Sequence, residues 1–262
     1  MLVSPSIQYI NLLGIHIYIY GIVLALAIFV AVKITDTIAK KEYNIDFIYE
    51  QSIFIILSGL IGARLYYCLV NFNTYLENPL RILNIREGGL SIHGAIIAGI
   101  LAIFLFSKKY NINFFKLCDL YALTMPLAQA IGRWGNFFNS EAYGLPTNSI
   151  LKLYVSPEFR VEQYEQFNYF HPTFLYESVL NFLLFLFLYF FILKRYKNHY
   201  GIISGAYLTI YAIIRILIEP LRLDCTTYIG IIPLPIIVSI IMLILGITII
   251  GFSLKDKLHS SK

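Results

Sequence analysis

The stretch from Ile131 to Gly144 reads IGRWGNFFNSEAYG and closes a long apolar run. It places the guanidinium of Arg133, the carboxamides of Asn136 and Asn139 and the carboxylate of Glu141 where hydrocarbon is expected around the backbone. An arginine in the middle of a membrane costs roughly 2.5 to 3.5 kcal/mol on insertion scales, which makes an intramembrane arginine a candidate functional residue. The sequence therefore predicts that this stretch holds something charged.

A simpler interpretation of Arg133 is an arginine whose side chain snorkels to the lipid headgroups. The polar neighbours of Arg133 disfavour it, because a snorkelling arginine needs no carboxamides beside it. Gly132, Gly135 and Gly144 also leave room for close approach of a partner helix or a ligand.

Composition identifies the class of protein. The 262 residues are 58% hydrophobic and 13% charged, whereas a soluble domain has about 45 to 50% apolar and 25% charged residues. We therefore expect a polytopic membrane protein. The three cysteines, Cys68, Cys118 and Cys225, stand far apart with no Cys/His cluster, so they predict packed side chains rather than a metal site or a disulfide framework. The N-terminus lacks the basic region of a signal peptide, and the first apolar helix is expected to be retained.

Hydrophobic runs predict an all-α polytopic membrane protein with seven transmembrane helices and a small extracytoplasmic cap. We expect residues 1–262 to form a single integral membrane domain, with the cap in the polar loop 139–173. Pro126 and Gln129 predict a kink and a polar contact, and Tyr207, Tyr211 and Arg215 share one helix face. The expected helices are residues 17–32, 48–70, 90–107, 117–138, 174–193, 201–218 and 229–252, with His16, Tyr18 and Tyr20 at the interface of the first.

Cationic residues predict the orientation. Twelve lysines and arginines follow the first, third, fifth and seventh helices, five lie in the opposite loops, and Arg64, Arg133 and Arg215 are intramembrane. By the positive-inside rule the N-terminus lies outside and the C-terminus is cytoplasmic, and this distribution explains the net charge of +5 without a nucleic-acid partner. The first set is Lys33, Lys40, Lys41, Lys108, Lys109, Lys116, Lys194, Arg195, Lys197, Lys255, Lys257 and Lys262, and the second is Arg81, Arg86, Lys152, Arg160 and Arg222.

This orientation brings four groups to one depth. Helices 48–70, 117–138 and 201–218 run outward and end near Arg64, Arg133 and Arg215, while the helix from residue 90 runs inward and begins near His93. The three arginines and His93 are therefore expected to converge in the outer third of the membrane.

Several guanidiniums at that depth suit an anionic phospholipid headgroup whose acyl chains remain among the helices. Two alternatives stay open on the residues alone. The arginines could form structural bridges with Glu141, Glu177 and Glu219, or they could line the cavity of a transporter for anionic lipids, although no internal repeat is evident. No Gly-x-Ser-x-Gly elbow, His-Glu-x-x-His pair or nucleotide-binding loop appears, so we expect neither a cofactor nor a metal.

Several segments resemble the bacterial phosphatidylglycerol:prolipoprotein diacylglyceryl transferase family. The strongest is GRWGNFFNSEAYG at 132–144, which is similar to the family signature Gly-Arg-x-Gly-Asn-Phe-x-Asn-x-Glu with a nearby glycine. The chain departs from the family where Ala95 follows His93-Gly94 in place of a second glycine, and where Ile19 precedes Tyr20-Gly21 in place of tryptophan. The other similar segments are Tyr20-Gly21, GARLYY at 62–67, GGLSIHGA at 88–95, HPTFLYE at 171–177 and YAIIRILIEPLR at 211–222.

The resemblance implies transfer of the diacylglyceryl group of phosphatidylglycerol to the lipobox cysteine thiol of a preprolipoprotein, in the outer half of the bacterial cytoplasmic (inner) membrane. The partners implied are phosphatidylglycerol, the preprolipoprotein signal peptide and the membrane. The catalytic residues would be His93 as base, Arg133 and Arg215 as phosphate clamp, and Tyr211 as hydrogen-bond donor. The substrate-binding residues would be Tyr20, Arg64, Asn136, Asn139, Glu141, Gly144, Glu219 and Arg222.

Overall fold

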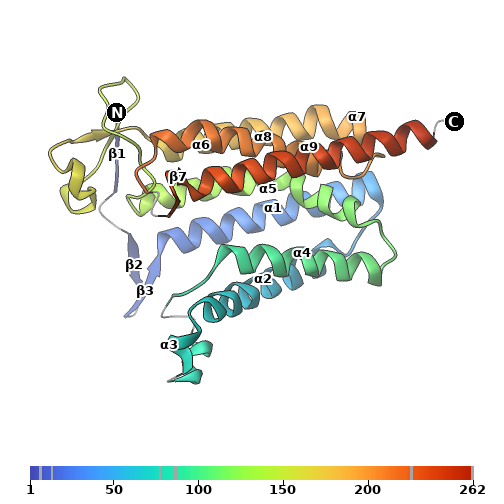
Figure 1. Ribbon diagram of the computed structural model, residues 1–262, viewed down its shortest axis with the longest axis horizontal. Coiled ribbons are helices and arrows are strands. Elements are labelled where there is room, and N and C mark those ends of the chain that lie inside the picture. The colour runs from blue at the N-terminus through green and yellow to red at the C-terminus, as the bar shows by residue number, and fades with distance from the viewer. Residues whose placement is uncertain (6–7, 13, 77, 85–87, 225–226, 261–262) are drawn as a thin grey trace. The chain divides into compact units, whose positions relative to one another are not determined.

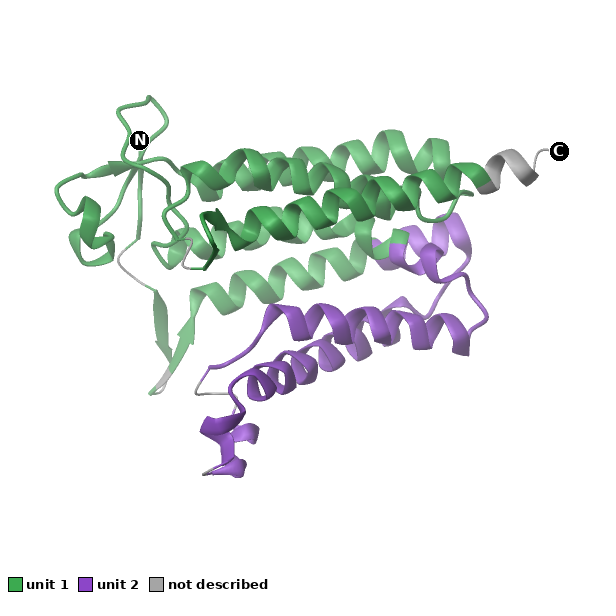
Figure 2. Cartoon of the chain, in the orientation of Figure 1, with its two compact units in different colours: residues 1–34, 119–262 green, residues 35–118 purple. Residues whose placement is uncertain are grey.

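The computed structural model is mostly helical and describes residues 1–5, 8–12, 14–76, 78–84, 88–224 and 227–260. Arg86, Cys225 and Lys262, for which the sequence predicts loop or packing positions, lie outside the described residues. The chain divides into two compact units, residues 1–34 with 119–262 (unit 1) and residues 35–118 (unit 2), drawn in two colours in Figure 2. The unit boundaries fall inside the helices α1 (Ile19–Tyr43) and α5 (Phe114–Phe138).

Unit 1 contains most of the long helices (Figure 1). They are α1 (Ile19–Tyr43) as far as residue 34, α5 (Phe114–Phe138) from residue 119, α6 (Thr173–Phe187), α8 (Ile202–Ile218) and α9 (Leu234–Ser260). From α6 the chain continues through the π-helical segment Leu188–Leu193 and α7 (Lys194–Tyr196). The 3₁₀ turn η6 (Glu219–Leu221) follows α8 directly.

Asp119 locks α5 to the start of α8. Its buried carboxylate accepts hydrogen bonds from the backbone N–H groups of Gly201 at 2.7 Å and Ser204 at 2.8 Å, and from the Ser204 hydroxyl at 2.5 Å. The first backbone N–H groups of a helix have no partner within the helix, so a side chain from α5 supplies the cap that α8 needs. This contact fixes the two helices that carry Arg133 and Arg215.

Unit 2 contains α2 (Ile48–Val70), α3 (Phe72–Leu76), the 3₁₀ turn η1 (Pro79–Leu83) and α4 (Ile92–Lys109). Small residues allow α2 and α4 to pack closely: a Cβ atom added to Gly62 would lie 2.6 Å from the carbonyl oxygen of Gly94. Close approach at glycine is a common way to associate helices in a membrane, where burial of apolar surface contributes little.

Six helical segments in the described part of the chain are long and apolar enough to cross a membrane. They are residues 19–43, 48–70, 92–109, 173–196, 202–221 and 234–255. These segments confirm the prediction of a mainly helical, multi-pass membrane protein. Helix α5 has 25 residues but is not among the six, because polar and charged residues along its length, Lys116, Asp119, Gln129, Arg133 and Asn136, lower its hydropathy.

Short β-hairpins stand in the place of the expected first turns of the first and last helices, which begin at Ile19 and Leu234 rather than at residues 17 and 229. Residues 9–12 and 15–18 form strands β2 and β3, which pair with Tyr9 opposite Tyr18, so His16 and Tyr18 lie in a strand and only Tyr20 lies in α1. Residues 228–229 and 232–233 form β6 and β7 before α9. The all-α description therefore needs this correction, and α9 begins just before Pro235, where a missing backbone N–H costs no helical hydrogen bond.

Helix α1 also continues beyond Val32, its predicted end, to Tyr43. The charges that suggested a loop are accommodated in the helix, since Lys40 and Asp36 pair at 2.8 Å over one turn. The helix stops at Asn44, which adopts φ of 53°, while the N–H of Ile45 donates to the carbonyl of Ala39 at 3.1 Å. Asparagine tolerates this left-handed conformation better than most residues, which makes it a helix stop.

The polar loop between α5 and α6 folds around a small core that it shares with the N-terminal strand and the first turn of α6. Strand β4 (Leu153–Tyr154) lies between β1 (Leu2–Val3), to which it is parallel, and β5 (Tyr169–Phe170), to which it is antiparallel. The hydroxyl of Tyr143 donates to the carbonyl of Phe159 at 2.7 Å, and burial raises the pKa of this tyrosine. The buried residues of this core are Tyr143, Leu153, Val155, Phe170 and Phe174.

Candidate active site

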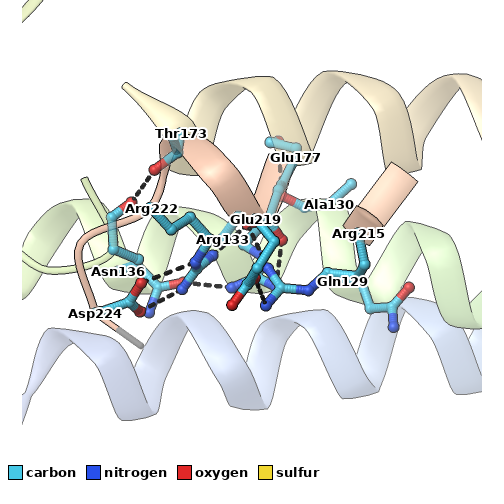
Figure 3. A network of polar contacts seen from close by, with 12 residues as sticks. Gln129, Ala130, Arg133, Asn136, Thr173, Glu177, Arg215, Glu219, Arg222 and Asp224 are labelled. Carbon is cyan, nitrogen blue, oxygen red and sulfur yellow. Dashed lines mark hydrogen bonds and ion pairs between the residues drawn. The ribbon is translucent and has the colours of Figure 1, made fainter. Parts of the chain in front are cut away.

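A buried carboxylate on α6 organises the charged groups of unit 1. Glu177 has no exposed surface, and it pairs with Arg133 from α5, Arg215 from α8 and Arg222 from the segment after η6. Its Oε2 lies 2.5 Å from Nη2 of Arg133, and its Oε1 lies 3.1 Å from Nη1 of Arg215 and also accepts from Nη1 of Arg222. Figure 3 shows these side chains converging from separate elements.

Two further carboxylates complete the charge cluster. Nη2 of Arg215 lies 2.5 Å from Oε2 of Glu219, one turn further along the chain. Arg222 reaches Asp224 with two nitrogens, and the Nε to Oδ1 distance is 2.8 Å. Burial alone would lower the pKa of Arg222, but its hydrogen bond to Asp224 and the charge of Glu177 raise that pKa above its ordinary value, so the guanidinium stays charged.

Asn136 connects Arg133 to Glu141. Its Oδ1 accepts from Nη1 of Arg133 at 3.3 Å, and its Nδ2 donates to Oε1 of Glu141 at 2.8 Å. The chain can turn back so sharply because α5 ends at Phe138 and Ser140 adopts φ of 54°. Glu141 therefore reaches Arg133 through an asparagine rather than by direct contact.

Gly144 positions the backbone that carries Arg222. It forms an antiparallel bridge with Arg222, and the N–H of Leu145 donates to the carbonyl of Leu221 at 2.8 Å. A Cβ atom at position 144 would lie 2.5 Å from that same carbonyl oxygen and 2.8 Å from Cγ2 of Thr173. Only glycine fits between these two groups.

The remaining predicted residues of unit 1 lie around this cluster. The ring of Tyr20 packs on the backbone of Gly135, where an added Cβ atom would meet Cδ2 of the ring at 2.7 Å. Tyr211 is half-buried on α8, one turn before Arg215, and its ring stacks on Tyr207 with centroids 5.7 Å apart. Asn139 contributes its backbone carbonyl, which accepts from the side chain of Gln8 at 3.1 Å.

Arg64 and His93 belong to unit 2. All of the guanidinium nitrogens of Arg64 donate to backbone carbonyls, at distances between 2.6 and 3.1 Å. These carbonyls belong to Arg81, Ile82, Asn84, Gly88 and Gly89. Arg64 therefore holds the described residues on both sides of positions 85–87, shortly before α4 begins. His93 is exposed in the first turn of α4, with its ring centroid 5.9 Å from that of Tyr66.

Comparison of the sequence with known protein families identifies the family of this chain. The model of the family described as prolipoprotein diacylglyceryl transferase matches residues 8–252. The chain belongs to the prolipoprotein diacylglyceryl transferase family. The match takes in all twelve of the predicted site residues, from Tyr20 to Arg222.

Relatives named phosphatidylglycerol–prolipoprotein diacylglyceryl transferase match most of the chain, and three of them show the range of similarity. The protein from Fervidobacterium nodosum is 50% identical over 170 residues, which cover 64% of this chain and 58% of that protein. The protein from Trichormus variabilis is 40% identical over 226 residues, 84% of this chain and 80% of the relative. The protein from Clostridium botulinum strain Langeland is 39% identical over 242 residues, 91% of this chain and 93% of the relative.

The structure places ten of the twelve predicted residues in unit 1, and it gathers the three arginines among them, Arg133, Arg215 and Arg222, around the carboxylate of Glu177. Sequence reasoning gave Glu177 only a supporting role and did not select Asp224. The signal for Glu177 was its place in HPTFLYE, directly after a loop and inside an apolar helix. Within the described ranges, no three His, Cys, Asp or Glu side chains gather in a way that suits a metal ion.

Proposed function

We propose that this chain transfers the diacylglyceryl group of phosphatidylglycerol to the lipobox cysteine of a preprolipoprotein, the first step of bacterial lipoprotein maturation. In this reaction the cysteine sulfur bonds to the glyceryl carbon and forms a thioether. The bond between that carbon and the phosphate oxygen breaks, and the electron pair leaves with glycerol phosphate. The thiol proton goes to a base. Family membership and the names of the relatives support this activity.

The single observation that supports the chemistry is the group of three guanidiniums around Glu177. An arginine has five N–H donors. Among the described residues, Arg133 pairs only with Asn136 and Glu177, and Arg215 only with Glu177 and Glu219. Their side chains remain 20% and 13% exposed, so each guanidinium keeps donors that a phosphate can reach. Fixed donors of this kind stabilise the charge of a leaving phosphate.

The structural-bridge alternative also has support, because the guanidiniums already have carboxylate partners. The number of charges in the cluster helps to distinguish a structural role of the arginines from phosphate binding. Arg133, Arg215 and Arg222 face Glu177, Glu219 and Asp224, so a bound phosphate adds one anion to a neutral set. Asp224 has 43% of its side chain exposed, whereas Glu177 and Glu219 are buried. We propose that the phosphate replaces Asp224 at Arg222, since an exposed carboxylate can turn into water at little cost.

The other residues take roles that fit this geometry. Tyr211 donates a hydrogen bond to the phosphate, and Tyr20 lines the lipid pocket beside Gly135. Asn136, fixed by Glu141, orients Arg133 from one side while Glu177 orients it from the other. Arg64 shapes the loop before α4, and His93 is the proposed base because its ring is exposed at the start of that helix. Asn139 and Gly144 hold the turn that follows α5.

We further propose seven spans, with α5 added to the six apolar segments because it is long enough and its polar end binds the headgroup. In this topology the protein lies in the cytoplasmic membrane with its N-terminus outside. The site then lies in the outer half of the bilayer, and the folded loop between α5 and α6 forms the extracytoplasmic cap. Labelling of single cysteines placed next to Arg133 and next to Arg215 tests this topology, which fails if the two positions are reached from opposite sides.

Purified protein in detergent with phosphatidylglycerol and a lipobox peptide tests the activity. The expected products are a peptide heavier by one diacylglyceryl group and an equal amount of glycerol phosphate. The same peptide with serine in place of its cysteine is the control and should stay unmodified. A protein that moves lipid between leaflets but leaves the cysteine peptide unchanged would be a transporter, and the proposal would be wrong.

A further inference from the structure

A second layer of polar side chains lies one helical turn from the charged cluster, toward the middle of the helices. Four residues of α-helix advance about 6 Å along the axis and return to the same face. Each helix that carries a charge of the cluster also carries a polar residue at this spacing. The pairs are Arg133 and Gln129 on α5, Glu177 and Asn181 on α6, and Arg215 and Tyr211 on α8.

The side chains of this layer are connected across helices. Nε2 of Gln129 donates to the hydroxyl of Tyr207 at 2.9 Å, which joins α5 to α8. Tyr207 in turn stacks on Tyr211 with an angle of 25° between the rings. Figure 3 shows Gln129 and Asn136 on opposite sides of Arg133 along α5, so the layer continues the site away from the loop end.

Hydrogen-bonding groups in this layer lack partners among the described residues. Asn181 has no exposed surface, yet neither its Nδ2 nor its Oδ1 has a partner, and Oε1 of Gln129 is likewise buried without one. Asn181 faces α5, because Ser178, three residues earlier, donates to the carbonyl of Ala130 at 2.8 Å. Buried polar groups without partners are rare and costly, so this layer has a capacity for hydrogen bonds that a ligand can use.

We infer that Gln129, Asn181 and Tyr207 form a subsite for the ester carbonyls of the glyceryl group, an inference that rests on the proposed function. In a diacyl phospholipid the ester carbonyls are a few covalent bonds from the phosphate, on the side of the acyl chains. A phosphate at Arg133 and Arg215 therefore brings them toward the layer one turn deeper. A carbonyl accepts hydrogen bonds, and the donors that the layer offers at that depth are Nδ2 of Asn181, which lacks a partner among the described residues, and the hydroxyl of Tyr207, which accepts from Gln129 and is free to donate its own proton.

Transfer from diester and diether phosphatidylglycerol tests the inference, since the diether keeps the phosphate and the chains but has no ester carbonyl. The unmodified protein should use the diester with a higher kcat/KM, by roughly 3- to 10-fold for one neutral hydrogen bond. Tyr207→Phe and Gln129→Leu should lower transfer from the diester and leave transfer from the diether nearly unchanged. The ratio of kcat/KM for the diester to kcat/KM for the diether should therefore fall toward one. Asn181→Leu should do the same.

Tyr189→Phe is the matched control, because it removes a hydroxyl from the Leu188–Leu193 segment, three turns from Glu177, and should keep the ratio of the unmodified protein. Tyr207→Phe keeps the ring and its stacking, so it stays informative even if Gln129→Leu does not fold. An equal use of both lipids by the unmodified protein, or a ratio unchanged in all three variants, would overturn the subsite. Failure of the unmodified protein to modify the peptide from the diester would instead contradict the proposed function and this inference with it.

Discussion

Arg133 on α5 and Arg215 on α8 share a single carboxylate, that of Glu177, at 2.5 and 3.1 Å. The two arginines lie on different helices, so neither helix alone sets the distance between them. Their separation is fixed by α6, which carries Glu177, and by the Asp119 cap that joins α5 to α8. The carboxylate between them holds both guanidiniums in place as hydrogen-bond donors, an arrangement that suits the proposed phosphate.

Replacement of Glu177 tests whether this carboxylate sets the geometry. Glu177→Gln keeps the shape of the side chain but removes the charge that Arg133, Arg215 and Arg222 share. Removal of one partner of a buried ion pair costs about 3 to 5 kcal/mol. We expect a lower Tm and a fall in transfer of more than about 100-fold. Glu158→Gln, in an exposed turn, is the control, and equal activity of the two variants would contradict the role of Glu177.

Lysine at the two central arginines separates charge from geometry. Arg133→Lys and Arg215→Lys keep the positive charge, but an ammonium cannot hold a carboxylate and a phosphate in the planar arrangement of a guanidinium. We expect kcat/KM to fall about 100-fold for each, with membrane insertion intact, and alanine at either position to abolish transfer. Arg195→Lys at an exposed position should remain near normal. Near-normal turnover in either central variant would mean that the arginine does not bind the phosphate.

Gly144→Ala tests the backbone that holds Arg222. The new methyl group would lie 2.5 Å from the carbonyl oxygen of Leu221, so the segment that leads to Arg222 has to move. Overpacking of this kind costs about 1 to 3 kcal/mol. We expect a lower Tm and at least a 10-fold loss of transfer. Gly251→Ala, where an added Cβ atom meets nothing within 4 Å, should keep both.

The contiguous part of the site was predictable from the sequence, and the part assembled by packing was not. Arg133, Asn136 and Glu141 lie within nine residues, so spacing alone places them together. The sequence alternative that paired arginines with glutamates is realised for Glu177 and Glu219, but Glu141 bonds to Asn136 instead. Which arginines reach Glu177 depends on how α5, α6 and α8 pack, and no local pattern encodes that.

The ends of the helices were also predictable from the sequence only in part. The expected end of the first helix at Val32 was wrong because hydrophobicity marks the membrane core rather than the end of the helix. The actual stop was readable in Lys41 to Ile45, KEYNI, which is repeated as KKYNI at the end of α4. In both places the asparagine is left-handed, with φ of 53° at Asn44 and 51° at Asn111. The hairpins before α1 and α9 are short, and their residues also suit an apolar helix, so periodicity could not separate the two.

Asp224→Asn tests the proposed exchange of anions at Arg222. If the phosphate replaces this exposed carboxylate, removal of the negative charge of Asp224 leaves the phosphate with one competitor fewer for Arg222. We expect KM for phosphatidylglycerol to fall by about 2- to 5-fold, the size of one exposed charge interaction, and the effect to shrink at high salt. Glu162→Gln, in an exposed part of the loop, should leave KM unchanged. A higher KM for Asp224→Asn would mean that Asp224 orients Arg222 and stays in place when lipid binds.

The pH profile of His93→Gln tests the proposed base. A cysteine thiol has a pKa of about 8.5, so at neutral pH only a small part of the peptide is thiolate without a base. With His93 in place, transfer should level off below the pKa of the thiol, because the imidazole takes the proton as the sulfur attacks. In His93→Gln we expect the rate at pH 7 to fall by about 10²- to 10⁴-fold, the range of general base catalysis, and to rise about tenfold per pH unit toward 8.5 as thiolate forms.

His199→Gln is the control and should have the rate and pH profile of the unmodified protein, since this histidine lies in the turn between α7 and α8. An unchanged rate and profile for His93→Gln between pH 6 and 9 would assign proton removal to another group or to water, because glutamine cannot accept the proton.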